Sequence, residues 1–242
     1  MKNLDDVTGK RQFGKNLAIY WSVQVLVILS GFVIPRQISD HLGAVDLGTW
    51  DLGWAAYRYL SLTGIGAVGV TRYIAMYRAG ESISAQSRVF TVAILIQTLV
   101  AILVLSSSIL LSIYVAKSGF GDFDKTAVST LILLFSTAIC FRFLGEPARG
   151  VITGYHRFDL HHLIGASQDF LLALGLLAAL SFGAELVHLG YIVVLSAMLT
   201  SLVRFFFMRK VAPTIRFDVS EWSIKEARKL FRFGAKSLAN SS

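Results

Sequence analysis

Six long apolar runs constrain the fold of this chain more than any other feature of its sequence. The runs cover residues 17–35, 47–71, 89–116, 127–147, 163–184 and 187–208. A helix needs about 20 apolar residues to cross roughly 30 Å of hydrocarbon, and each run is near or above that length. Six such runs in 242 residues are not typical of the buried helices of a soluble protein. The sequence therefore predicts an all-α membrane protein with six transmembrane helices.

Basic residues are divided unequally between the two sides of this predicted bundle. The chain has 23 Lys and Arg against 15 Asp and Glu. Eighteen of the basic residues fall in the N-terminal tail, in the second and fourth connections, or after the sixth run, with Arg204 counted in this last group. Only Arg36, Lys117 and Lys125 fall in the alternate connections. Because cytoplasmic loops are enriched in Lys and Arg, both termini are predicted to be cytoplasmic, and the surplus is not interpreted as a nucleic-acid footprint.

The sequence also predicts how the chain is divided. The expected segments are a cytoplasmic tail (1–16), the six-helix bundle (17–208), a basic cytoplasmic linker (209–229) and the start of a seventh helix (230–242). Phe13–Ala18, which opens the first run, is similar to Phe233–Ala239, which follows the sixth with one inserted residue. Many transporters are built from paired repeats with the binding site between them. The chain is therefore expected to supply one lobe of a two-lobe transporter, either as a fragment or beside a second chain.

Polar residues inside the runs are the candidate site residues, because a charge in the membrane costs several kcal/mol unless it meets a partner or a cavity. They are Arg58, Arg142, Asp51, Glu146, Asp169, Gln24, Gln97 and, at the outer end of the first run, Arg36. Asp51 and Arg58 share a helix face but lie about 10 Å apart along the axis. Arg58 therefore needs a partner on another helix or an anionic ligand. Arg142 and Glu146, four residues apart, form either an internal ion pair or part of the site.

Motifs of enzymes and of metal sites are weak in this sequence. Gly64–Gly69 has the G-x-G-x-x-G spelling but lies in an apolar helix, where small residues favour close packing or a local break. His156, His161 and His162 lack a recognisable metal-ligand spacing and are interpreted as loop histidines. There is no Walker A sequence and no credible nucleophile–base pair. We expect no enzymatic activity and no cofactor.

Several short motifs spread over most of the chain point to one family. They are Lys15-Asn16, Arg36, Leu42-Gly43, Leu47-Gly48-Thr49-Trp50, Gly66 through Arg72-Tyr73, Gly150, and Gly154-Tyr155-His156-Arg157-Phe158. In these the sequence resembles the bacterial oligosaccharide (O-antigen) flippases of the polysaccharide biosynthesis family. Their superfamily also holds the lipid II flippases and the multidrug-extruding MATE transporters. The resemblance implies two six-helix bundles facing a central cavity, of which this chain would supply the N-terminal one.

The resemblance also implies a location and a substrate. The location is the bacterial cytoplasmic (inner) membrane. The substrate is an oligosaccharide on a polyprenyl pyrophosphate, moved to the outer leaflet by alternating access for O-antigen and lipopolysaccharide synthesis. By position, Arg58 and Arg142 would bind the pyrophosphate, because guanidinium groups pair well with phosphate. The expected partners are membrane lipid, the lipid-linked oligosaccharide, and a glycan polymerase or glycosyltransferases, with no nucleic acid.

The sequence is also compatible with other functions. One is a multidrug or small-cation exporter of the same superfamily, although two basic residues inside the runs favour an anionic cargo. Another is a non-transporting membrane partner of glycan-assembly enzymes. A membrane-embedded transferase would need His or Asp residues gathered in an outer loop, where His41 and His188 stand alone.

Overall fold

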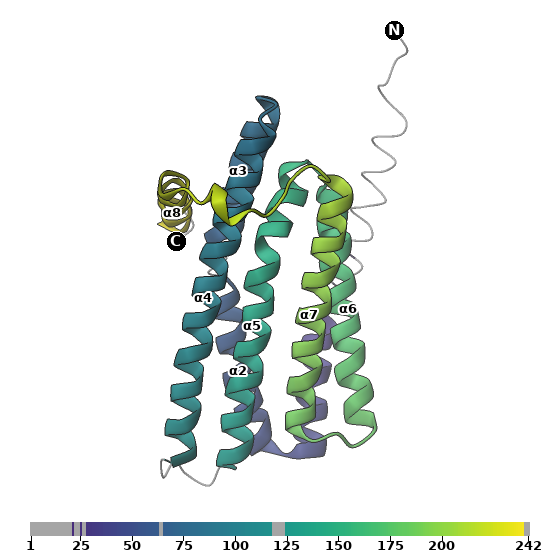
Figure 1. The fold of residues 1–242 in the computed structure, drawn as a ribbon. Helices are drawn as coiled ribbons and strands as arrows, with labels where there is room; N and C mark the ends of the chain where they lie inside the picture. The colour runs from purple at the N-terminus through teal and green to yellow at the C-terminus, as the bar shows by residue number, and fades with distance from the viewer. Residues whose placement is uncertain (1–20, 22–24, 26–27, 63–64, 118–123, 240–242) are drawn as a thin grey trace, which may run out of the picture.

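The chain folds into an upright bundle of helices with one helix lying across it. The computed structural model describes residues 21, 25, 28–62, 65–117 and 124–239, and no strand occurs among them. Residues 28–42 are helical. The helices that follow are α2 (Ala44–Leu62), α3 (Ile65–Ala79), α4 (Ile83–Lys117), α5 (Lys125–Gly154), α6 (Phe158–Ser181), α7 (Leu186–Val211), the 3-10 helix η1 (Val219–Glu221) and α8 (Ile224–Ala239). In Figure 1, α2 to α7 run up and down beside one another, and α8 is seen end-on.

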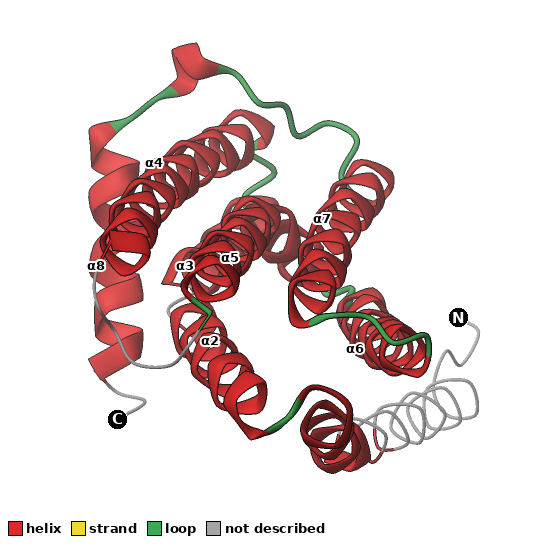
Figure 2. Ribbon diagram, turned by 90° about the horizontal axis from the view of Figure 1, so that it is seen from below, coloured by secondary structure: helices red, strands yellow, loops and turns green. Residues whose placement is uncertain are grey.

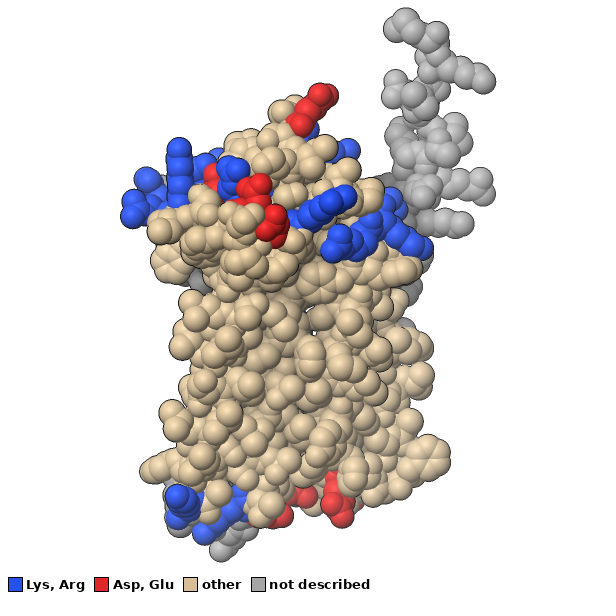
Figure 3. Space-filling view, viewed as in Figure 1, with Lys and Arg blue, Asp and Glu red and all other residues tan. Residues whose placement is uncertain are grey.

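Four of these helices, α4, α5, α6 and α7, are long and apolar enough to cross a membrane. Even α6, the shortest of the four at 24 residues, is about 36 Å long at 1.5 Å per residue. The face seen in Figure 3 has a broad uncharged band between two charged ends. The prediction of an all-α chain is therefore confirmed, and the four long apolar helices fit a membrane protein; the count of six spanning helices is not confirmed, because the described residues give four candidates.

The first two predicted spans are the ones that differ. The run over 47–71 contains most of α2 and the first part of α3, and residues 63–64 between them lie outside the described part of the chain. Helix α2 carries Asp46, Asp51 and Arg58, and α3 as described has 15 residues, so neither is among the four helices long and apolar enough to span a membrane. The run over 17–35 lies partly outside the described residues, and its described part continues as helix past Pro35 to residue 42.

Helix α5 also passes a proline at which the sequence predicted its end. Proline removes a backbone donor and usually breaks a helix interior, yet α5 continues from Pro147 to Gly154. Ala148, Val151 and Ile152 in this last part are almost fully buried. Thr153 contributes a hydroxyl that lies 2.7 Å from the hydroxyl of Thr71 on α3. Packing against the neighbouring helices thus outweighs the local helix-breaking signal.

Helix α5 is the central element of the bundle, in contact with α2, α3, α4, α6 and α7. Two clusters of buried apolar side chains surround it, one toward each end of the bundle. We call one end the basic end, where the connections 80–82, 155–157 and 212–218 lie, and the other the opposite end, with Gly43, Asp124 and the connection 182–185. Figure 2 looks along the bundle from the opposite end.

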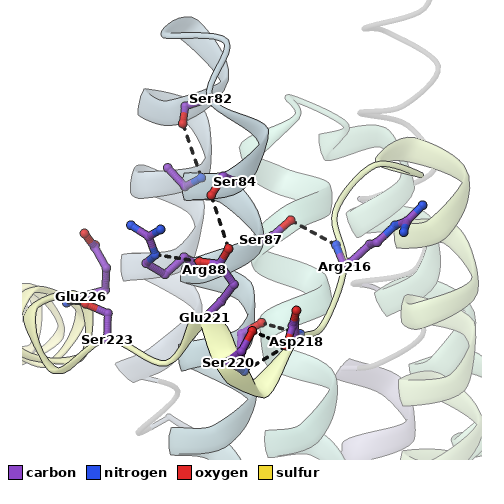
Figure 4. A network of polar contacts seen from close by, with 12 residues as sticks. Ser82, Ser84, Ser87, Arg88, Arg216, Asp218, Ser220, Glu221, Ser223 and Glu226 are labelled. Carbon is purple, nitrogen blue, oxygen red and sulfur yellow. Dashed lines mark hydrogen bonds and ion pairs between the residues drawn. The ribbon is translucent and has the colours of Figure 1, made fainter.

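Helix α8 lies across the basic end, where Figure 2 shows it lengthwise while α4 to α7 are seen nearly end-on. The segment before it is held along α4, as Figure 4 shows. Arg88 Nε donates to Glu221 at 2.9 Å, and the amide of Asp218 donates to the Thr91 hydroxyl at 3.1 Å. The linker predicted over 209–229 therefore contains the end of α7 and the start of α8. Of the similar segments, Phe233–Ala239 lies in α8 and Phe13–Ala18 lies outside the described residues, so a second bundle stays a prediction.

Candidate binding site within the bundle

A buried carboxylate joins two arginines near the basic end of the bundle. Glu146 of α5 is 6% exposed, and its Oε1 accepts a hydrogen bond from Arg204 Nη1 of α7 at 3.0 Å. Its Oε2 accepts one from Arg149 Nε, one turn further along α5, at 2.7 Å. Arg204 is 7% exposed. We call Glu146, Arg149 and Arg204 the ion triad, and it links α5 to α7 inside the bundle.

Close packing of α5 on α7 makes this triad possible. A Cβ atom placed on Gly145 would lie 2.7 Å from the Ser201 hydroxyl oxygen and 3.2 Å from the Ser201 Cα. Only glycine lets the two backbones approach so closely at this point. Ser201 is three residues before Arg204, so the close contact holds the guanidinium beside Glu146. The ion pair is therefore a product of helix packing as well as of charge.

One turn deeper on α5, Arg142 has different surroundings. Its Nη1 donates to the Tyr57 hydroxyl of α2 at 3.2 Å, and its guanidinium carbon lies 5.3 Å from the centre of the Tyr57 ring. Tyr57 is almost fully buried, whereas Arg142 is half-buried. Within the described part of the chain, Arg142 makes no ion pair with a carboxylate. A neutral phenol thus holds this guanidinium, and its charge is not cancelled by a direct partner.

Asp169 of α6 brings two further charges to the same region. Arg142 of α5, Arg58 of α2 and Arg204 of α7 all lie close enough to act electrostatically on its carboxylate. Both Arg58 and Asp169 are exposed on the surface of this chain. We call Arg58, Arg142 and Asp169 the open group, because these charges from α2, α5 and α6 are reached from outside the bundle.

An apolar groove lies between α2, α4 and α5, and the three residues of the open group are not part of its lining. Its volume is about 770 Å³, and its lining includes Leu52, Leu131, Phe135 and Ile139. Tyr57 lines the groove as well. The residue that holds the Arg142 guanidinium is therefore also part of an apolar surface.

The structure separates the residues that the sequence predicted for one site. It brings together Arg58, Arg142, Glu146 and Asp169, and it places the other described candidates elsewhere. Arg36 lies at the opposite end, exposed, with Nε 3.7 Å from Asp40. Asp51 is exposed on α2, and Gln97 is buried on α4. Gln24 lies outside the described residues. Their roles in binding stay predictions.

Sequence reasoning missed two members of the ion triad. Arg204 was counted in the basic tail, but it lies inside α7 and is buried. Arg149 was counted in a loop, but α5 extends past it. An internal pair with Arg142 was one of the two interpretations of Glu146, whereas Arg149 and Arg204 take both carboxylate oxygens. The i,i+3 spacing of Glu146 and Arg149 on one helix could have predicted their pairing from the sequence. The contact of Glu146 with Arg204 joins residues 58 apart, and no local pattern predicts it.

The described residues contain no group of three or more His, Cys, Asp and Glu side chains that could hold a metal ion. His161 and His162 lie side by side, with ring centres 5.1 Å apart. Two imidazoles are fewer than the three or four ligands of a typical zinc site.

Comparisons with known proteins leave the family open. No protein-family model, no curated protein and no solved structure matches this chain.

Proposed function

We propose that this chain is one lobe of a membrane transporter that moves a polyprenyl-pyrophosphate-linked oligosaccharide across a bacterial inner membrane. One observation carries the proposal. Tyr57 lines an apolar groove of about 770 Å³ and also accepts a hydrogen bond from Arg142. A hydrophobic surface and a guanidinium without a direct ion-pair partner therefore meet at one residue, which suits an amphiphile with an anionic head.

The pyrophosphate would bind at the open group. Arginine has five N–H donors in a planar fork that pairs with phosphate oxygens through two parallel bonds. Among the described residues, Arg142 donates one bond, to Tyr57, and other donors remain for a ligand. Exposed Arg58 adds a second cation to the same region. Asp169 limits the net positive charge, so that the headgroup is released as well as bound.

The polyprenyl tail would lie in the apolar groove. Binding sites for small molecules typically have volumes of about 300 to 1,000 Å³ and are lined mostly by apolar side chains, with a few polar groups that fix orientation. The groove has this size and character. In a membrane its open side would face acyl chains, so that an isoprenoid enters sideways without crossing water.

The direction of transport follows from charge placement. The basic end would face the cytoplasm, because short cytoplasmic loops are rich in Lys and Arg. The face with Arg58 and Asp169 would meet a second lobe, and rocking of one lobe against the other would alternate access. A small-cation exporter is less well supported, because arginines take both oxygens of the buried carboxylate of Glu146.

A binding titration tests the proposal. The full chain in lipid nanodiscs is titrated with a fluorescent polyprenyl-pyrophosphate oligosaccharide and with the same oligosaccharide on a neutral polyprenyl ether. We expect tighter binding of the pyrophosphate form, and a loss of about tenfold or more in Arg142→Gln, because a hydrogen bond to a charged group contributes roughly 1.5–3 kcal/mol. Arg209→Gln, an exposed arginine at the basic end, is the control and should bind like wild type. Equal affinity for the two ligands, or unchanged binding by Arg142→Gln, would contradict the proposal.

A further inference from the structure

Helix α8 has a basic face and an apolar face. At 100° per residue, Lys225, Arg228, Lys229 and Arg232 fall within an arc of about 100°. The apolar positions Ile224, Ala227, Leu230 and Phe231 fall on the other side of the helix. This separation, with large apolar residues opposite Lys and Arg, is typical of helices that lie in the plane of a membrane surface.

Contacts with α3 fix the rotation of α8 about its own axis. Leu230 is buried and packs so closely on Gly69 that a Cβ there would lie 3.1 Å from it. The carboxylate of Glu226 instead accepts a hydrogen bond from the Tyr77 hydroxyl at 3.2 Å. Because α3 runs toward the basic end, Tyr77 lies about 12 Å nearer that end than Gly69. The side of α8 that carries Leu230 is therefore turned toward the mid-height of the bundle. The side beyond Glu226 is turned toward the basic end.

The two faces of α8 then have defined directions. Ile224 and Phe231 are each 68% exposed and lie on the same side of α8 as Leu230. They therefore face the level of the uncharged band. Lys225 and Arg232 lie on the other side, toward the basic end. Figure 3 shows basic side chains gathered at this level, above the uncharged surface. Apolar groups thus point to the depth of acyl chains and cations to the depth of headgroups.

A pocket of about 390 Å³ lies on the basic face, lined by Ile224, Lys225, Arg228, Lys229 and Arg232. Lys229 Nζ donates to Glu226 at 2.7 Å and to the Tyr77 hydroxyl at 3.3 Å. The bond to Glu226 and then the bond to Tyr77 raise the pKa of Lys229, so this cation stays charged at neutral pH. Within the described part of the chain, the other three basic side chains of the pocket form no ion pair.

We propose that α8 is an in-plane membrane helix whose basic pocket binds the phosphate headgroup of an anionic phospholipid. Two features favour a membrane lipid over a soluble anion. The pocket includes the exposed apolar Ile224 next to its cations, and the helix lies across a bundle with four helices long enough to span the membrane. The site is separate from the open group and does not depend on the transported substrate.

Depth measurements test the orientation of α8. The chain contains one cysteine, Cys140, so Cys140→Ser gives a background for single nitroxide labels at positions 224, 231, 225 and 232. In vesicles that contain phosphatidylglycerol, labels at 224 and 231 should be more accessible to oxygen than to a water-soluble nickel chelate. The order should reverse at 225 and 232. Equal accessibility to the nickel chelate at 231 and 232 would overturn the in-plane placement.

Lipid selectivity tests the pocket itself. The full chain is purified from equimolar phosphatidylglycerol and phosphatidylcholine, and the bound lipids are counted by native mass spectrometry. The triple variant Lys225→Gln, Arg228→Gln, Arg232→Gln should lose phosphatidylglycerol preference by about fivefold per charge. The triple variant Arg209→Gln, Lys210→Gln, Arg216→Gln removes the same charge at the same end outside α8 and should keep it. Equal losses in both variants would mean that net charge alone explains the preference. Displacement of the lipid by millimolar inorganic phosphate would indicate a site for a soluble anion. Either result overturns the proposal.

Discussion

Two groups of charges lie one helical turn apart on α5, and they are held in opposite ways. In the ion triad, the Glu146 carboxylate is shared by Arg149 and Arg204, and the groups are mostly buried. In the open group, Arg142 is held by a phenol, and Arg58 and Asp169 are exposed. The triad has its partners within the fold, whereas the open group has charge and surface available for something outside it.

The neighbouring helices explain this difference. Glu146 faces α7, which approaches closely at Gly145 and brings Arg204 with it. Arg142 faces α2, which contributes an aromatic ring and a hydroxyl rather than a carboxylate. Charges on one helix face thus become structural or available for binding according to the helix packed against them. Substitutions in the triad should therefore affect mainly folding, and those in the open group mainly binding.

The largest effect is expected when the shared carboxylate is removed. Glu146→Gln leaves Arg204 buried without its counter-charge, and breaking a buried ion pair in this way costs about 3–5 kcal/mol. We expect a strongly lowered melting temperature in detergent and poor recovery of monodisperse protein. Glu185→Gln, an exposed glutamate at the opposite end, should behave like wild type. A stable Glu146→Gln protein with impaired ligand binding would place the triad in the binding site and break the comparison.

A smaller effect is expected from crowding the contact that brings α7 to the triad. In Gly145→Ala, the new methyl group would meet Ser201 at 2.7 Å, and overpacking of this kind costs about 1–3 kcal/mol. Gly165→Ala on α6 is the matched control, because no atom lies within 4 Å of its added methyl group. The control should be neutral or slightly stabilising, since alanine favours helix over glycine. Thermal unfolding of the two variants in the same detergent would show whether close packing supports the triad.

The sequence predicted the long apolar helices well because their signal is local. Helices α4 and α7 nearly coincide with their predicted runs, extended by a few residues at the ends. The error at Pro147 arose because a proline is a local signal, while the burial that keeps α5 helical beyond it comes from other helices. Residues 63–64 of the second run lie outside the described part of the chain, so the local break that its small residues allow stays a prediction.

The candidate site was less predictable because it depends on pairing between helices. Arg142 and Glu146 stand out as charges in apolar runs, but nothing local shows that Glu146 pairs with Arg204 of α7. The role of Tyr57 was also hidden, since an aromatic residue in an apolar helix is common and its contact with Arg142 joins residues 85 apart. Intramembrane charge indicates that a partner exists; only the fold shows which residue it is.

The smallest effect, and the sharpest test of the comparison, comes from Tyr57→Phe. This change keeps the ring near the Arg142 guanidinium and the lining of the groove, and removes only the hydroxyl that accepts the 3.2 Å hydrogen bond. A hydrogen bond to a charged group contributes roughly 1.5–3 kcal/mol; this one is long at 3.2 Å and its guanidinium is only half-buried, so we expect the lower end of that range and a fall in melting temperature no larger than in Gly145→Ala. Binding of the polyprenyl-pyrophosphate ligand should weaken by a few-fold, because Arg142 is less well positioned, and by less than in Arg142→Gln. Leu111→Ala, which alters the groove from α4 at an exposed position, should weaken the pyrophosphate and neutral ligands equally, whereas Tyr57→Phe should weaken only the pyrophosphate form. If Tyr57→Phe instead destabilises the fold as much as Gly145→Ala and leaves binding unchanged, the Arg142–Tyr57 contact is structural, and the distinction between the open group and the ion triad is lost.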